Sequence, residues 1–173
     1  SISAGFSNFA FKFANMKHAS LIILCILAVT VSSCNHYNKL QKTNDFGYKY
    51  EAAKQYYAEG QYNRAALFMQ DVIAMLKGTD KGEESLFLLG MSSFKARNYD
   101  AATSYFRKYY QTYPKGIYAE KARYYCGMSL YKNTPEVKLD QTATYEAVTE
   151  FQNFLETYPQ SELGGEVREL IFS

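Results

Sequence analysis

Few side chains in this 173-residue sequence could carry out chemistry by themselves. There are 3 cysteines and 2 histidines, and His36 is the one histidine that follows Cys34. The sequence contains no Cys-x-x-Cys pair, no His-Glu-x-x-His zinc motif, no Gly-x-x-x-x-Gly-Lys phosphate loop and no Gly-x-Ser-x-Gly elbow. We therefore expect no enzymatic activity, no metal and no other cofactor.

Cys34 is the cysteine whose surroundings indicate a modification. It ends the sequence Val-Ser-Ser-Cys and follows a run of mostly aliphatic residues at 21–31, which is too short for a bilayer-spanning helix of about 20 residues. This pattern resembles the signal peptide and lipobox of bacterial lipoproteins. We expect residues 16–33 to be the signal peptide, Cys34 to carry the lipid anchor, and residues 1–15 to be a non-native extension.

The remaining composition excludes some classes of protein. Cys126 would be the one cysteine left without a modification, so an intrachain disulfide is not expected, and we predict a small apolar helix residue there. The formal net charge is only +2, which disfavours nucleic-acid binding. Aromatic residues make up 17% of the sequence, with no Trp, and this favours large, half-polar packing and contact surfaces.

Two internal similarities indicate a repeat architecture. Residues 106–114 and 151–159 superimpose at an offset of 45 and both end in Thr-Tyr-Pro, and residues 61–66 match residues 98–103 at an offset of 37. The segments resemble tetratricopeptide repeats, in which two antiparallel helices occupy about 34 residues. In that pattern small residues let helices approach closely, aromatic residues fill the space between hairpins, and proline ends the second helix. The small positions are Ala53, Gly90 and Gly127.

We therefore predict an all-α fold, a tetratricopeptide-repeat helical-hairpin solenoid of about three repeats preceded by a lipoprotein signal peptide. A solenoid needs a capping repeat at its end, so we also expect the chain to be truncated at its C-terminus. The predicted segments are a lipidated, flexible tether at residues 34–44, repeats at residues 45–78, 79–115 and 116–160, an enlarged loop at residues 133–144 inside the third repeat, and the start of a truncated fourth repeat at residues 161–173.

One face of the three first helices carries aromatic side chains at equivalent repeat positions. Within each helix, three residues at positions i, i+4 and i+7 lie on the same face. In the repeat family this face usually lines the concave groove. Two interpretations stay open: the residues pack neighbouring first helices together, or they bind an extended or hairpin peptide rich in aromatic residues. The candidate peptide-binding residues are Tyr50, Phe87 and Tyr124, Lys54, Met91 and Met128, and Tyr57, Phe94 and Tyr131.

The lipobox, the short tether, the Tyr-Pro endings and the insertion at residues 138–142 together resemble the BamD family. These are lipoprotein subunits of the β-barrel assembly machinery of the Gram-negative outer membrane. The resemblance implies five repeats, a lipid anchor on the periplasmic face of the outer membrane, and unfolded outer-membrane β-barrel proteins as substrates of the N-terminal repeats. The C-terminal repeats of the family would bind BamA and other subunits. Because we expect those repeats to be missing from this truncated sequence, no residue of this chain is assigned to that contact.

Two alternative functions have weaker support in the sequence. A periplasmic scaffold of the Tol-Pal cell-division coordinator type shares the Tyr-Pro endings, but it typically lacks a lipobox and carries a coiled-coil segment before its repeats. A glycan-binding uptake lipoprotein with helical repeats would be expected to expose Trp, which is absent here.

Overall fold

The computed structural model describes residues 39–133 and 142–172. The chain divides into two compact units, Ser1–Asn44 and Asp45–Ser173. The predicted signal peptide, the lipidated Cys34 and most of the enlarged loop lie outside the described residues.

The described part of the first unit is short and covers only residues 39–44 of the predicted tether. Residues 39–42 are helical, and Leu40 is fully buried. Removing this apolar side chain from water stabilises the local structure. The surrounding sequence is polar and lacks obvious periodicity, so it gave no sign that Leu40 is buried.

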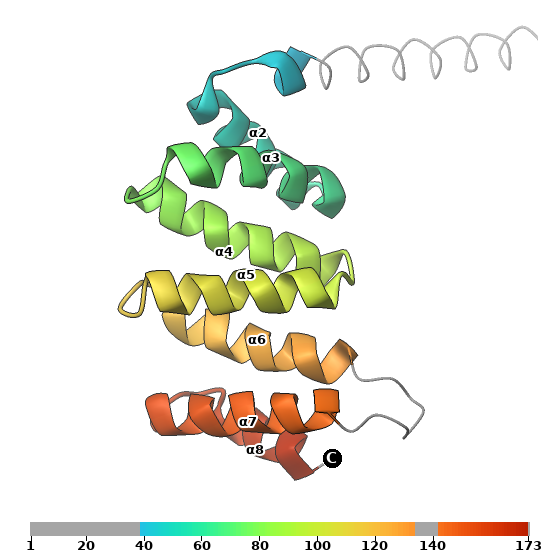
Figure 1. Ribbon diagram of the computed structural model, residues 1–173, viewed down its shortest axis with the longest axis vertical. Helices are drawn as coiled ribbons and strands as arrows, with labels where there is room; N and C mark the ends of the chain where they lie inside the picture. The colour runs from blue at the N-terminus through green and yellow to red at the C-terminus, as the bar shows by residue number, and fades with distance from the viewer. Residues whose placement is uncertain (1–38, 134–141, 173) are drawn as a thin grey trace, which may run out of the picture. The chain divides into compact units, whose positions relative to one another are not determined.

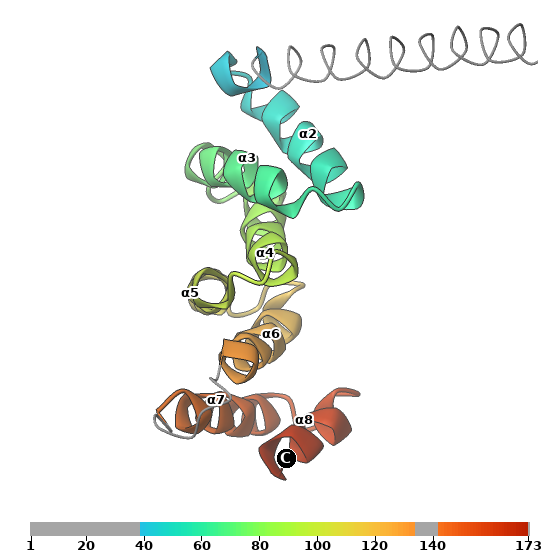
Figure 2. The ribbon, with the colours of Figure 1, turned by 90° about the vertical axis from the view of Figure 1, so that its right-hand side faces the viewer.

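The second unit consists of helices that follow one another in chain order (Figure 1). Each helix packs mainly on its neighbours in sequence, and α4 also contacts α2 and α6. Figure 2 shows α3, α5 and α7 on one side of α4 and α6. No strand occurs in residues 39–133 or 142–172, and the predicted all-α helical-repeat fold is confirmed. The helices are α2 (Phe46–Ala58), α3 (Tyr62–Met75), α4 (Asp80–Lys95), α5 (Tyr99–Thr112), α6 (Ala119–Asn133), α7 (Thr142–Thr157) and α8 (Gly164–Phe172).

Local signals explain where several helices begin and end. The Asp45 carboxylate accepts a hydrogen bond of 2.9 Å from the backbone N–H three residues later, and the Thr79 hydroxyl accepts one of 3.1 Å in the same way. Such caps pair backbone donors that the first turn leaves free. Helices α5 and α7 each end two residues before a proline, Pro114 and Pro159. The proline ring clashes with the residue before it, and this disfavours the helical conformation of that residue.

A glycine under an aromatic ring allows close helix contact within each of two hairpins. A Cβ atom added at Gly90 would lie 2.6 Å from Cε1 of Phe106, and one added at Gly127 would lie 2.5 Å from Cε1 of Phe151. Both rings are fully buried, at 0% and 1% exposed. The structure therefore identifies the group that approaches each small residue as the ring from the second helix of the same hairpin.

Cys126 is a buried helix residue. Its Sγ atom donates to the backbone oxygen of Thr103 over 3.8 Å, and burial raises the pKa of the thiol to about 12. A thiol that stays protonated is a poor nucleophile, and the predicted role as a small apolar residue is confirmed. Within residues 39–133 and 142–172, no helix is both long enough and apolar enough to cross a membrane.

Candidate protein-binding face on the first helices

Burial divides the predicted peptide-binding residues into two groups. All of them lie on the first helices α2, α4 and α6. Four are buried, with at most 7% of the residue exposed: Tyr50, Phe87, Met91 and Tyr124. The others are partly or clearly exposed: Lys54, Tyr57, Phe94, Met128 and Tyr131.

Phe87 packs between the second and third repeats. Its ring stacks on Tyr118, with a centroid distance of 4.4 Å and an interplanar angle of 6°, and stands edge-on to Tyr109 at 5.9 Å. Phe87 and Met91 belong to the same buried apolar cluster. Both are packing residues, which corrects their assignment to the floor of a peptide-binding groove. The covering ring of Tyr118 comes from the segment before α6, and the helix periodicity gave no sign of it.

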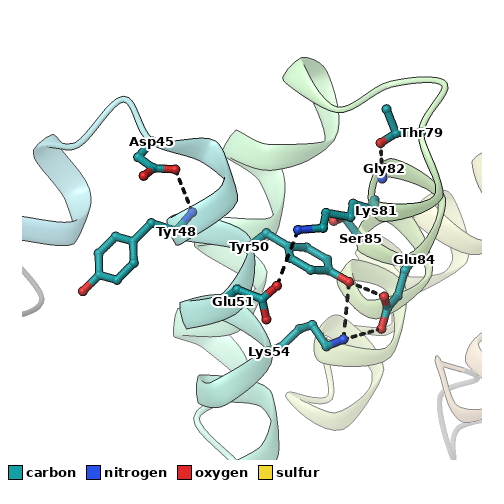
Figure 3. A network of polar contacts seen from close by, with 10 residues as sticks. All are labelled: Asp45, Tyr48, Tyr50, Glu51, Lys54, Thr79, Lys81, Gly82, Glu84 and Ser85. Carbon is teal, nitrogen blue, oxygen red and sulfur yellow. Dashed lines mark hydrogen bonds and ion pairs between the residues drawn. The ribbon is translucent and has the colours of Figure 1, made fainter.

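Tyr50 joins α2 to α4 through a polar network (Figure 3). Its hydroxyl donates a hydrogen bond to the Glu84 carboxylate. The ammonium of Lys54 lies 2.9 Å from Glu84 Oε1 and 3.3 Å from the Tyr50 hydroxyl. The Lys81 ammonium lies 5.0 Å from the centroid of the Tyr50 ring. Tyr50 is therefore an inter-repeat contact, and for this residue the structure favours the packing interpretation over its assignment as a peptide-binding residue.

Electrostatics in this network favour the charged carboxylate. Burial acts to raise the pKa of Glu84, but the hydrogen bonds from Tyr50 and Lys54 outweigh it and hold that pKa below its usual value. The contact with Glu84 raises the pKa of Lys54, and burial raises the pKa of Tyr50. The ion pair is partly exposed, with 40% and 27% of the two side chains accessible.

We expect acid to weaken the contact between α2 and α4. A carboxyl group with a lowered pKa in the folded state stabilises the fold above its unfolded pKa of about 4.3, and this contribution is lost as the pH falls through the folded pKa. Glu84→Gln should therefore flatten the fall of the urea midpoint below about pH 5. Because solvent screens the pair, the expected difference is below about 1 kcal/mol.

The matched control for this acid titration is Glu169→Gln, since Glu169 is an exposed acid on α8. This variant should follow the parent protein across the acid range. If Glu84→Gln also follows the parent protein, the network adds no pH-dependent stability.

A second tyrosine–carboxylate contact joins α6 to α8. The Tyr124 hydroxyl donates to Glu166 Oε1 over 2.7 Å, while the ring stands edge-on to Phe154 at 6.1 Å. Tyr124 occupies the same repeat position as Tyr50, and here too the structure favours the packing interpretation over the assignment as a peptide-binding residue. Glu84 and Glu166 occupy equivalent positions two repeats apart, because the repeat offsets of 37 and 45 add up to their separation. This signal could have identified the two carboxylate partners, but Lys121 stands at the position between them.

The accessible residues form what we call the first-helix face, made of Lys54, Tyr57, Phe94, Met128 and Tyr131. The rings of Tyr57 and Phe94 occupy equivalent positions and stand edge-on to the first aromatic residue of the following helix, at 5.5 and 5.6 Å. Tyr131, at the same position of the third repeat, is 39% exposed. Each of the helices α2, α4 and α6 therefore presents an accessible aromatic ring at this repeat position, near its C-terminal end.

Stacked helical hairpins with repeating aromatic positions define a helical-repeat protein. The family model described as outer membrane lipoprotein, YfiO, matches residues 43–173, and the chain belongs to this family. The match includes every described helix of the second unit and agrees with the resemblance found in the sequence. A search of curated proteins gave no match.

Proposed function

We propose that this protein is an outer-membrane protein assembly factor. It would be a lipid-anchored scaffold on the periplasmic face of the outer membrane that binds unfolded β-barrel proteins and helps their insertion. The observation that carries the proposal is the family match over residues 43–173, and the resemblance to the BamD family supplies the assembly role. BamA and the other subunits of the β-barrel assembly machinery are the proposed partners.

The first-helix face is the proposed contact for the substrate. Strands of membrane β-barrels alternate apolar and polar residues and are flanked by aromatic girdles, so an extended strand can place apolar side chains against the rings of Tyr57, Phe94 and Tyr131. Met128 adds an adaptable apolar surface. A substrate that must be released to another subunit calls for a dissociation constant in the micromolar range, or about 8 kcal/mol of binding free energy.

We expect the double variant Tyr57→Ser, Tyr131→Ser to bind a peptide of a β-barrel terminal strand about tenfold more weakly. Each aromatic contact contributes about 0.5 to 1.5 kcal/mol, and two such losses account for that change. Both side chains are at least partly exposed, so the helical circular dichroism signal should be retained. Fluorescence anisotropy of a labelled peptide measures the affinity.

Two single variants serve as controls for lost exposed apolar surface. Ile117 and Tyr145 are 82% and 76% exposed, and they lie outside the first-helix face. Ile117→Ser and Tyr145→Ser should bind the peptide as the parent protein does. A well-folded double variant with unchanged affinity would place the substrate contact elsewhere.

A further inference from the structure

A groove of about 370 Å³ opens between α3 and α5, above α4. This volume falls within the usual range for ligand sites, about 300 to 1,000 Å³. Ile73 and Ala74 of α3 and Leu86 of α4 supply apolar walls, and the exposed Lys77 and Lys108 also line the groove. Figure 2 shows α3 and α5 on the same side of α4, so the groove belongs to the second helices and not to the first-helix face.

The next repeat explains why this space is open. Leu86 corresponds to Arg123 at the repeat offset of 37. The Arg123 guanidinium lies 4.6 Å from the centroid of the Tyr110 ring on α5 and donates to Thr157 Oγ1 on α7 over 3.0 Å. A polar side chain thus links α5 to α7, whereas the shorter, apolar Leu86 cannot link α3 to α5 in that way.

One direct bond does join the two walls of the groove. The Gln70 amide donates to the Tyr105 hydroxyl over 2.6 Å, and Gln70 also lines the groove. Lys77 comes two turns after Gln70 on the α3 side, and Lys108 comes one turn after Tyr105 on α5. The groove is therefore bridged at one end, and its cationic residues lie toward the other end.

The charges of the groove favour an anionic occupant. Two lysines line it and no carboxylate does. In the part of the chain that the structure describes, neither Lys77 nor Lys108 makes an ion pair. An apolar pocket with cations on its wall selects a ligand that carries an apolar group next to a negative charge.

We propose that this groove binds an acidic, apolar peptide segment of a partner protein. One aromatic or aliphatic side chain would enter between Ile73 and Leu86, and neighbouring aspartate or glutamate residues would pair with Lys77 and Lys108. The amide of Gln70 and the hydroxyl of Thr112, both on the groove lining, can bond to a peptide backbone. An acyl chain has no groups to pair with them, which favours a peptide as the occupant.

The probe is a blocked, fluorescein-labelled peptide whose core is Asp-Phe-Leu-Glu, titrated into the purified full chain and followed by anisotropy. We expect saturable binding that weakens as salt is raised, because exposed ion pairs are screened. The same peptide with Asn-Phe-Leu-Gln as its core should bind at least tenfold more weakly. The proposal does not depend on the proposed function, since it concerns a different row of helices.

Three variants test the site itself. Lys77→Gln with Lys108→Gln should weaken binding at least tenfold, while the charge-matched control Lys121→Gln with Lys132→Gln, on exposed residues of α6, should stay within twofold of the parent protein. Ala74→Trp should also abolish binding, because Ala74 is an exposed groove residue and the larger side chain fills the space without changing the charge.

Four outcomes would overturn the proposal. The first two are the absence of saturable binding and equal binding of the acidic and amide peptides. The third is unchanged affinity in the Lys77 and Lys108 double variant. The fourth is displacement of the peptide by laurate at laurate concentrations below the dissociation constant of the peptide. The last result would identify the groove as a site for an acyl carboxylate. Unchanged binding of the β-barrel peptide in these variants would leave the proposed function intact.

Discussion

Replacing Gly127 by alanine is expected to destabilise the helical array by about 2 kcal/mol. A methyl group there would lie 2.5 Å from Cε1 and 2.6 Å from Cδ1 of Phe151, well inside van der Waals contact. The ring is 1% exposed and has no free space to enter, and overpacking of this kind costs about 1 to 3 kcal/mol. The sign of the change in the free energy of unfolding tests the contact, because alanine in place of glycine at an open helical position would instead stabilise the fold by up to about 1 kcal/mol.

The measurement is urea-induced unfolding followed by helical circular dichroism. Gly165→Ala is the matched control, since nothing lies within 4 Å of a Cβ atom added at that position of α8; it should be neutral or slightly stabilising. Gly90→Ala should resemble Gly127→Ala, because the added Cβ atom would lie 2.6 Å from Phe106 Cε1.

A double-mutant cycle separates the close contact from general strain. Phe151→Leu alone creates a void and should destabilise the fold. In the presence of Gly127→Ala, the smaller side chain leaves room for the new methyl group, so the combined loss should be clearly less than additive. Stabilisation by Gly127→Ala, or simple additivity with Phe151→Leu, would contradict the ring-over-glycine packing.

The second large effect is expected for the lipid anchor. Cys34→Ala should move the protein almost completely from the membrane fraction to the soluble fraction. Each buried methylene of an acyl chain contributes about 0.8 kcal/mol, and stable anchoring takes two membrane-binding signals, such as the acyl chains of a lipidated cysteine. Removing the cysteine removes every chain at once. Immunoblots of fractionated Gram-negative cells that express the full sequence measure the change.

Cys126→Ala is the matched cysteine control. Its thiol is fully buried in the described fold, so acylation there is not expected and this variant should stay in the membrane fraction. Labelling with a radioactive fatty acid should mark the parent protein and Cys126→Ala but not Cys34→Ala. Unchanged fractionation of Cys34→Ala would contradict the lipoprotein assignment.

Several features of the fold could be predicted from the sequence because their causes are local. Apolar residues recur with the spacing of a helix, prolines follow two of the second helices, α5 and α7, and the repeat offsets place Gly90 and Gly127 at equivalent positions. The residue at the small position is smaller where its partner on the second helix is a rigid ring. Gly90 and Gly127 lie under phenylalanine rings, whereas in the first repeat Ala53 stands at the small position and the more flexible Met69 at the position of the phenylalanine. Repeating helical hairpins follow from such patterns alone.

Only the tertiary structure decided which aromatic residues are accessible. Phe87 and Phe94 share a face of α4 and the same residue type, yet Phe87 is 7% exposed because Tyr118 stacks on it, while Phe94 stays partly open. The groove beside Leu86 likewise depends on what α3 and α5 bring to it. Burial and cavities arise from contacts between residues that are distant in the sequence, so helix periodicity can place a side chain on a face but cannot tell what covers that face.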